Sequence, residues 1–419
     1  MQYKKINKEG YTLHLIDTDR FKTINLVIFL SKKYNKKEIP CSIMLTQNMV
    51  YTSKKYNTKS KMAIIGEDLY GARVSSSYGV TGNICNFTFS LDFLNPKYTE
   101  EKYIDLTLDF LCEILFNPNV DENGFKEEYF NIIKSDTITR IKSIKDNPGL
   151  YASKEYAKIM YKGSPAEHGS NTTVEEVEKV TREEMYDFYK KLFTEEYKID
   201  ICVMGQLNDN LVNKIISRFN HIHGNNESYD LTVDIKYNNE IKEKIDSLPY
   251  NQSKLYMGYR LNDLTSHEMN HVLKVYNTIL GTMNDSILFN IVREANSLCY
   301  SIGSYTSRYN PSLTIYAGIN KTNYEKTVNL VKECVSMMSD KKTLERLFDS
   351  AKKTINTYLN NYYDDVTSQI NHYWLSEFES IEDIELQREE INKVTIDEVI
   401  ELNNKISLST IYLLKGEND

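Results

Sequence analysis

The spacing of apolar residues along the chain predicts groups of strands that alternate with groups of helices. Two runs rich in β-branched residues lie between Tyr11 and Leu30 around a polar turn, and they predict two strands. After Pro40 the pattern predicts a helix from Cys41 to about Lys55, and strands return from Leu69 to Phe93. Helices are then predicted over Tyr103–Phe116 and from about Glu122 to Ser143, and a short buried strand is predicted over Ile199–Met204.

Two stretches of the sequence recur in the same order. Residues 87–91 (FTFSL) resemble residues 313–317 (LTIYA), and each stretch precedes an acid-capped helix. Residues 180–184 (VTREE) recur as residues 394–398 (VTIDE), each followed by a helix, a polar turn, an apolar strand and a glycine. One such match means little, because capping boxes are common, but several ordered matches indicate an internal repeat.

The repeat predicts an α+β fold with two homologous domains, each an antiparallel sheet covered on one face by helices. We expect the first domain over residues 1–222 and the second over residues 246–419. The intervening residues 223–245 are largely polar, and we expect them to form a linker.

Composition excludes several functional classes. Fifty-nine acidic residues against 51 Lys and Arg give a net charge of −8, which argues against a nucleic-acid partner. No segment has the apolar length of a membrane span or an export signal. The six cysteines lack metal-binding spacing, so we expect reduced, buried thiols and a cytoplasmic location.

The stretch from Leu280 to Ser304 carries a resemblance to a known family. Arg293 precedes Tyr300 by seven residues, at a predicted corner between a helix and an alternating strand. This resembles the second-half signature of insulinase/pitrilysin-type (inverzincin) peptidases, in which an arginine and a tyrosine at this spacing contact bound peptide. The resemblance implies that Arg293 and Tyr300 bind substrate. The alternative is a plain helix–strand corner with a solvated arginine and a half-buried tyrosine.

The same family binds zinc through His-x-x-Glu-His on the first long helix and a glutamate on a later helix. The resemblance places Met44 and Asn48 at the two histidines, Gln47 at the general base and Ser135 at the later ligand. A thioether, an amide and a hydroxyl make a poor zinc site, and an amide cannot take a proton from water at neutral pH. The sequence contains no histidine between His14 and His168, so no shift of the alignment restores the motif.

Residues 267–271 (HEMNH) form a literal H-E-x-x-H zincin motif and offer an alternative zinc site through His267 and His271. Thr265 and Ser266 resemble a helix N-cap, however, which places His267 in a solvated first turn. His14, His168 and His372 are isolated in the sequence, and we expect them to be surface or hydrogen-bonding residues.

The resemblance extends over nearly the whole chain and is closest to the small, two-chain branch that includes the mitochondrial processing peptidase and bacterial relatives. It implies a catalytically inactive, non-catalytic subunit of a heterodimeric zinc peptidase that forms half of a peptide-binding chamber. No cofactor is expected in this chain, because zinc belongs to the sibling, a zinc-bearing YmfH-type chain. Peptide would add as a strand to an exposed edge at residues 73–78. Two alternatives are a structural pseudoenzyme without a peptide role and an independent zinc peptidase that uses His267 and His271.

Overall fold

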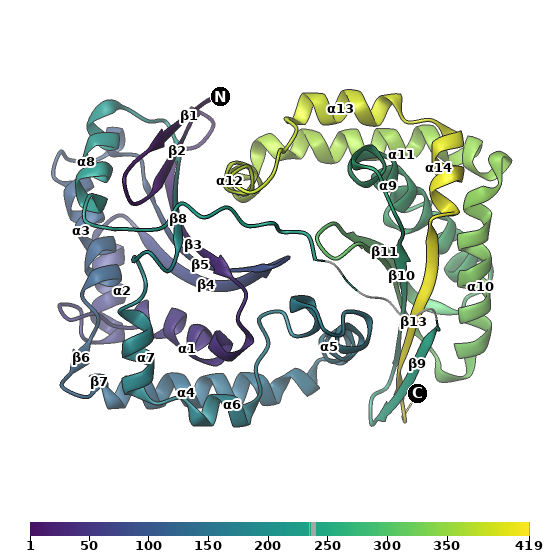
Figure 1. The fold of residues 1–419 in the computed structure, drawn as a ribbon, viewed down its shortest axis with the longest axis horizontal. Coiled ribbons are helices and arrows are strands. Elements are labelled where there is room, and N and C mark those ends of the chain that lie inside the picture. Colours follow the sequence, from purple (N-terminus) through teal and green to yellow (C-terminus); the bar gives the residue numbers. More distant parts are fainter. Residues whose placement is uncertain (234, 236–239, 419) are drawn as a thin grey trace. The chain divides into compact units, whose positions relative to one another are not determined.

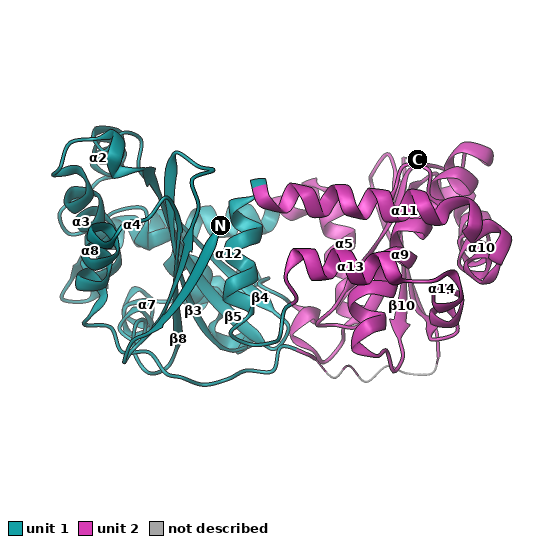
Figure 2. Ribbon diagram, turned by 90° about the horizontal axis from the view of Figure 1, so that it is seen from above, with its two compact units in different colours: residues 1–142, 169–231, 364–381 teal, residues 143–168, 232–363, 382–419 magenta. Residues whose placement is uncertain are grey.

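The computed structural model describes residues 1–233, 235 and 240–418, which form two units. The first unit comprises residues 1–142, 169–231 and 364–381, and the second comprises residues 143–168, 232–363 and 382–419 (Figure 2). The chain passes between the units at several points, and the one after residue 231 falls inside the predicted linker 223–245. Residues 234 and 236–239 of that linker lie outside the described residues.

The first unit is built on a six-stranded sheet in the order β1-β2-β8-β3-β5-β4 (Figure 1). Neighbouring strands are antiparallel except for β2 and β8, which are parallel. The strands are β1 (Gln2–Asn7), β2 (Thr12–Asp17), β3 (Thr23–Lys33), β4 (Arg73–Thr81), β5 (Ile84–Leu94) and β8 (Lys198–Gly205), with a separate pair β6 (Val120–Asp121) and β7 (Gly124–Phe125).

Helices of the first unit pack their apolar faces on one side of this sheet, around a core to which β2, β3, β5 and β8 all contribute. The helices on this side are α1 (Ile39–Met49), α2 (Lys59–Asp68), α3 (Tyr103–Phe116), α4 (Glu127–Lys142), α6 (Val174–Lys179), α7 (Arg182–Tyr189) and α8 (Asp209–Phe219), with the short turns η1 (Lys36–Glu38) and η2 (Pro96–Tyr98). Helix α12 (Val366–Leu375) also belongs to this unit but covers the other face of the sheet.

The second unit repeats this plan on a five-stranded sheet in the order β11-β12-β10-β13-β9, with one parallel pair, β13 and β9. The strands are β9 (Lys242–Leu248), β10 (Ser253–Leu261), β11 (Cys299–Ser307), β12 (Ser312–Ile319) and β13 (Ile406–Gly416). The helical elements are η3 (Ser143–Asp146), α5 (Pro148–Met160), η4 (Pro165–Glu167), η5 (Glu268–Val272), α9 (Leu273–Asn277), η6 (Thr278–Thr282), η7 (Phe289–Ala295), η8 (Lys321–Asn323), α10 (Tyr324–Ser336), η9 (Met337–Ser339), α11 (Lys341–Asn361), η10 (Tyr362–Asp364), α13 (Ile384–Lys393) and α14 (Ile396–Asn403).

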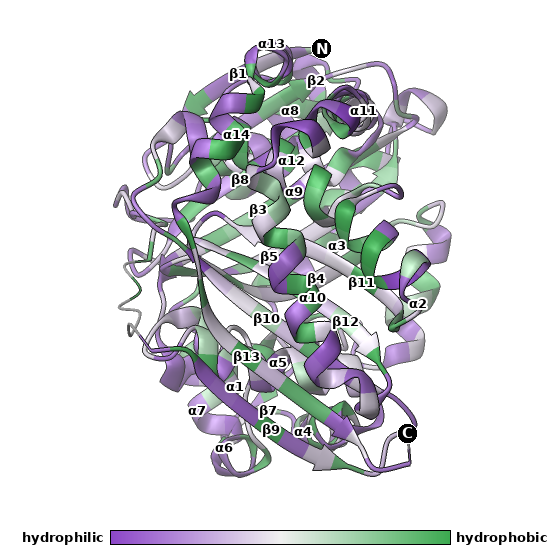
Figure 3. Cartoon of the chain, turned by 90° about the vertical axis from the view of Figure 1, so that its right-hand side faces the viewer, coloured by the Kyte–Doolittle hydropathy of each residue, from purple (hydrophilic) through white to green (hydrophobic). Residues whose placement is uncertain are grey.

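Local sequence signals explain several of these elements. Thr181 and Thr395 cap the N-termini of α7 and α14, and each side chain accepts a hydrogen bond from the backbone N–H three residues later. Helix α10 buries Val328, Val331 and Cys334 and exposes Asn329, Lys332 and Glu333. Its ribbon accordingly changes between hydrophobic and hydrophilic colours along its length (Figure 3). Within the described part of the chain, no helix combines the length and apolar character needed to cross a membrane.

The predicted α+β class is confirmed, with two differences of detail. Each sheet includes one parallel strand pair, so neither sheet is purely antiparallel. Each sheet also carries a helix on its second face: α12 packs against β2, β3 and β8, and α5 packs against β10 and β13. The prediction of helices on one face only is therefore incomplete.

The helix on the second face of each sheet comes from the other half of the sequence. Helix α5 comes from the first half but belongs to the second unit, whereas α12 comes from the second half but belongs to the first unit. The units therefore differ from the predicted domains 1–222 and 246–419 in these two segments. The reason is physical: helical periodicity marks which face of a helix is apolar, not which sheet that face will cover.

Close packing holds α5 on its sheet. Tyr156 is almost fully buried, stacks on Tyr256 with ring centroids 5.2 Å apart, and shares a 2.8 Å hydrogen bond with the Thr314 hydroxyl. A Cβ atom at Gly258 would lie only 2.3 Å from the Tyr156 hydroxyl oxygen. The absence of a side chain at Gly258 is thus what lets α5 approach β10 so closely.

Limited proteolysis tests this exchange. We expect first cleavage between residues 226 and 241, where Asn226, Glu227, Ser228 and Glu240 are exposed and polar. Denaturing gels should then show two fragments of similar size. Without denaturant the fragments should elute together in gel filtration, because the N-terminal fragment contains α5, which is part of the second unit's fold. Fragments that separate in native buffer, or earlier cleavage within residues 69–93, would contradict this account.

Candidate functional site

The positions aligned with the family's zinc ligands lie on α1 and α4, which contact each other. Met44 is completely buried in the first unit's core, and Asn48 is buried with its amide nitrogen lacking a hydrogen-bond partner. The Gln47 amide donates a 3.1 Å hydrogen bond to the Ile43 carbonyl, one turn earlier. Ser135 is exposed on α4.

These side chains do not fit a zinc ion. Met44 contributes a core thioether, and neither a neutral amide nor a serine hydroxyl supplies the imidazole or carboxylate donors that zinc prefers. The Gln47 amide is not basic, and its donor group already faces the helix backbone, so it cannot activate water. No hydrolytic step can be derived from these four residues.

The H-E-x-x-H motif lies in the second unit, and its groups are paired with other side chains. His267 Nε2 lies 3.0 Å from Glu398 Oε1, and His271 Nε2 lies 3.1 Å from Glu382 Oε1. Only 2% of His271 is exposed, and burial lowers its pKa despite the neighbouring Glu382. The His267 and His271 rings stand 5.3 Å apart, on the same side of the helix.

Glu268, which a zincin would use as its general base, is engaged elsewhere. The Lys405 ammonium lies 2.7 Å from its carboxylate, and the Thr265 backbone N–H donates to it. Burial acts to raise the pKa of Glu268, but Lys405 and Thr265 outweigh it, and the pKa lies below its ordinary value. A stabilised carboxylate turned toward lysine is a poor general base. The geometry thus argues against an independent zincin site.

Arg293 and Tyr300 line one cavity of about 570 Å³ in the second unit. Arg293 lies near the end of η7, where Ser297 adopts a positive φ of 52° and reverses the chain into β11. The Arg293 guanidinium lies over the Phe289 ring, 4.7 Å from its centroid, and 3.6 Å from Glu294. The remaining lining is mostly polar and comprises Asn251, Gln252, Glu294, Ser297, Leu298, Cys299, Ile319, Asn320 and Asn323.

A β-bulge in its strand places the Tyr300 side chain in solvent. β11 is an edge strand, and its pairing with β12 shifts between Cys299 and Ser301, so Tyr300 lies in a bulge. The tyrosine side chain is 81% exposed, far more than the half-buried residue of the alternative interpretation. Burial raises the pKa of the neighbouring Cys299 to about 11, so that thiol remains protonated at neutral pH.

The predicted edge at residues 73–78 forms most of β4, the last strand of the first sheet. Side chains alternate along it: Ser75 and Ser77 face a groove, whereas Ser76 donates to the Thr46 carbonyl and Tyr78 packs on the core. One edge of β4 is paired with β5, which leaves the backbone groups of its other edge available to an added strand.

The groove beside β4 has no counterpart among the features that the sequence predicts. It holds about 560 Å³ and is lined on the sheet side by Asn25, Val27, Phe29, Ser75, Ser77, Gly79, Val80, Thr81, Asn86, Thr88, Ser90 and Asp92. Helix α12 supplies the opposite wall through Val366, Thr367, Ile370, Asn371 and Trp374. Because α12 lies almost three hundred residues after β4, no local pattern indicates the groove.

Comparisons with known proteins agree with the geometry. Residues 179–355 match a family model described as "Peptidase M16 inactive domain". The chain is 26% identical over 422 residues to "Probable inactive metalloprotease YmfF" of Bacillus subtilis, covering 97% of this chain and 96% of that protein. It is 23% identical over 240 residues to "Uncharacterized zinc protease YmxG" of the same species, covering 57% of this chain and 56% of that protein.

Solved structures share the fold. A conserved protein from Enterococcus faecalis V583 gives a TM-score of 0.91 at 24% identity, covering 100% of this chain and 99% of that chain. A peptidase M16 inactive domain from Pseudomonas fluorescens gives a TM-score of 0.77 at 15% identity, covering 99% and 98% of the two chains. Identities this low support a common fold and carry no argument about activity.

Proposed function

We propose, from the premise that this chain belongs to the peptidase M16 (insulinase/pitrilysin-type) family, that it is the non-catalytic subunit of a heterodimeric zinc peptidase. It is an inactive, metalloprotease-like member of that family, which agrees with the resemblance drawn from the sequence. In the proposed complex it contributes half of a peptide-binding chamber. The catalytic zinc belongs to a sibling subunit, and this chain needs no cofactor of its own for that role.

One observation carries the proposal. The residues at the zinc-ligand positions cannot hold zinc, yet Arg293 and Tyr300 share an open, polar cavity. Tyr300 is 81% exposed, and an exposed aromatic side chain in a bulge contributes little to the stability of its own unit. Arginine offers a fixed fork of donors and tyrosine one phenolic donor, which suit the carbonyl oxygens of a peptide. The loss of zinc and the presentation of these two donors are explained together by a subunit that binds peptide for another chain.

The first unit adds a second feature that suits peptide. An extended peptide that pairs with the free edge of β4 would place alternate side chains on the groove side of the sheet. That side carries the polar residues Ser75, Ser77 and Thr88, and the groove is also lined by the apolar residues Val27, Phe29 and Trp374, so it can accept both polar and apolar side chains. Backbone pairing would supply affinity for the peptide, and the groove would supply selectivity for its side chains.

A cytoplasmic location is part of the same proposal. All six cysteines are free thiols in the structure. Free thiols are typical of reducing compartments. The proposed partners are the zinc-bearing sibling and a peptide substrate, with no nucleic acid and no membrane.

The isolated chain tests the proposal. We expect it to cleave no peptide, with or without added zinc, because Gln47 replaces the general base and Met44 and Asn48 replace the ligands. The measurement is cleavage of a mixed fluorogenic peptide library by the purified chain, with the zinc-bearing family member from the same cell as positive control. His267→Gln serves as the matched variant. Zinc-dependent cleavage that disappears in His267→Gln would establish the zincin alternative instead.

A further inference from the structure

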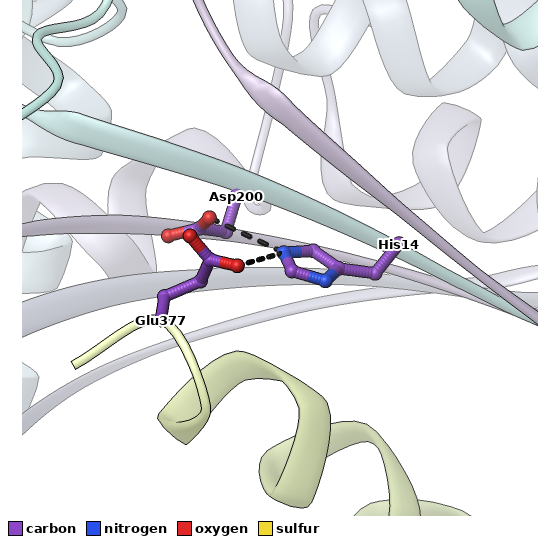
Figure 4. A group of neighbouring side chains, drawn as sticks. All are labelled: His14, Asp200 and Glu377. Carbon is purple, nitrogen blue, oxygen red and sulfur yellow. Dashed lines mark hydrogen bonds and ion pairs between the residues drawn. The ribbon is translucent and has the colours of Figure 1, made fainter. Parts of the chain in front are cut away.

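A group of buried polar side chains lies on the second face of the first sheet, away from α1. His14 comes from β2, Asp200 from the adjacent parallel strand β8, and Glu377 from the segment after α12. His14 and Asp200 are completely buried, and the Glu377 side chain is 7% exposed. Their ligand-type atoms all lie within 4.8 Å of one another. Figure 4 shows both carboxylates directed at the same nitrogen of His14.

The distances from His14 to the two carboxylates are poorly explained by hydrogen bonding alone. His14 Nε2 lies 3.3 Å from Asp200 Oδ1 and 3.9 Å from Glu377 Oε1. A single N–H cannot serve two acceptors well, and both distances exceed the usual range for an N–H···O bond. Zinc binds nitrogen and oxygen at about 2.0–2.2 Å, so ligand atoms at the corners of a tetrahedron lie about 3.3–3.6 Å apart. The first distance equals that edge, and the second exceeds it by about half an ångström.

A second observation also indicates a missing partner. Asp200 Oδ2 is buried and has no hydrogen-bond partner, which is costly for a carboxylate oxygen. Lys198 does not resolve this, because its ammonium lies 3.9 Å from the other oxygen, Oδ1, and 3.4 Å from Glu377. A cation bound across both oxygens of Asp200 would give Oδ2 the partner that it lacks.

A cation at this cluster would replace lysine contacts that the carboxylates make in the structure. Lys5 lies 2.5 Å from Glu377, but its side chain is 41% exposed and sits on the edge strand β1, so it can turn into solvent. His14 is held by the Tyr3 hydroxyl, 2.8 Å from Nδ1. With the proton on Nδ1, the histidine donates to Tyr3 and presents Nε2 as a free ligand, the arrangement commonly seen behind metal-bound histidines.

We propose that His14, Asp200 and Glu377 bind one divalent transition-metal ion of the zinc class. This ion is structural and separate from the catalytic zinc assigned to the sibling subunit. It joins β2 and β8 to the segment 364–381, which belongs to the second half of the sequence, and fixes that segment on the first unit. The inference goes beyond the proposed function, and its test needs no sibling.

The test uses the tag-free full chain after removal of metal with a chelator. Titration calorimetry with ZnCl₂ should give one site per chain, and Mg²⁺ should bind far more weakly, because it prefers all-oxygen octahedral sites. At a hundredfold excess of free zinc over Kd, the melting temperature should rise by roughly 5–10 °C. Tetrahedral Co²⁺ should give intense visible absorption at the same stoichiometry.

Substitutions in the cluster test whether His14 and Glu377 hold the metal ion. His14→Gln and Glu377→Gln should each lose the zinc-dependent rise in melting temperature, whereas the matched control His267→Gln should retain it. Glu377→Gln removes one charge at the edge of the cluster, so it remains informative if His14→Gln fails to fold by circular dichroism. No zinc binding, binding that survives in Glu377→Gln, or binding lost only in His267→Gln would overturn the proposal. The cluster would then be a charge network of carboxylates and lysines without a metal.

Discussion

Replacing Tyr300 with phenylalanine in this chain should slow peptide cleavage by the reconstituted pair by about a hundredfold or more. The change removes only the phenolic hydroxyl of a residue that is 81% exposed and lines the same cavity as Arg293. If that hydroxyl donates to the carbonyl under attack, its bond strengthens as negative charge develops on the oxygen. Loss of such a donor raises the barrier to cleavage and leaves assembly intact.

Arg293→Ala should slow the pair at least as much, because it removes both a charge and a fork of donors. Arg293→Lys keeps the charge but not the fork, so it should fall between wild type and Arg293→Ala. Tyr305→Phe is the matched control, since Tyr305 lies on the same strand, is 40% exposed and does not line the cavity. Steady-state cleavage is measured with complex formation checked by gel filtration. Unchanged rates in both Tyr300→Phe and Arg293→Ala complexes would favour the structural pseudoenzyme.

Replacing Tyr156 with alanine should lower the free energy of unfolding of the second unit by about 3–5 kcal/mol. Tyr156 is 1% exposed, and alanine would leave a cavity between α5, β10 and β12. Tyr156→Phe keeps the ring and loses only the hydrogen bond to Thr314, so it should cost about 1 kcal/mol. The effect should appear in the second unit, although Tyr156 belongs to the first half of the sequence.

Urea unfolding combined with hydrogen exchange checks whether Tyr156 stabilises the second unit. Backbone amides of β10 and β13 should lose protection in Tyr156→Ala, whereas those of β3 and β5 should keep it. The mirror variant is Trp374→Ala on α12, whose ring stacks on Phe29 with centroids 4.4 Å apart. It should reduce protection in the first unit. Loss of protection in the first unit alone on mutating Tyr156 would contradict the exchange of α5 and α12.

Local signals predicted those parts of the fold that depend on neighbouring residues. Apolar runs rich in β-forming residues located β3, β5 and β8, and the threonine caps located α7 and α14. Helix α2 was missed because Gly66 is its one buried residue, so its sequence has no apolar stripe to detect. Helix α5 carries a usable signal, with Ala152, Tyr156 and Met160 buried at intervals of one turn, but this spacing cannot identify the sheet that it covers.

The functional residues, like the helices, could be predicted only where they lie close together in the sequence. Arg293 and Tyr300 are close in sequence, and a single helix–strand corner brings them to one cavity, so their juxtaposition could be anticipated. His14 was expected to be a surface or hydrogen-bonding residue. It is completely buried, so the surface interpretation is wrong, and its hydrogen bond with the Tyr3 hydroxyl confirms the hydrogen-bonding interpretation. Its neighbours Asp200 and Glu377 reach it only through the parallel pairing of β2 with β8 and the return of α12 to the first sheet. Such long-range pairings leave no pattern within a window of sequence.

The central claim is that this chain supports peptide cleavage without holding the catalytic metal. The most direct measurement is the rate of peptide cleavage by the zinc-bearing sibling at fixed concentration while this chain is added in increasing amounts. We predict negligible cleavage by this chain alone, a rate that rises with each addition, and saturation at an equimolar ratio. A sibling that reaches its full rate alone and is unaffected by this chain would contradict the claim.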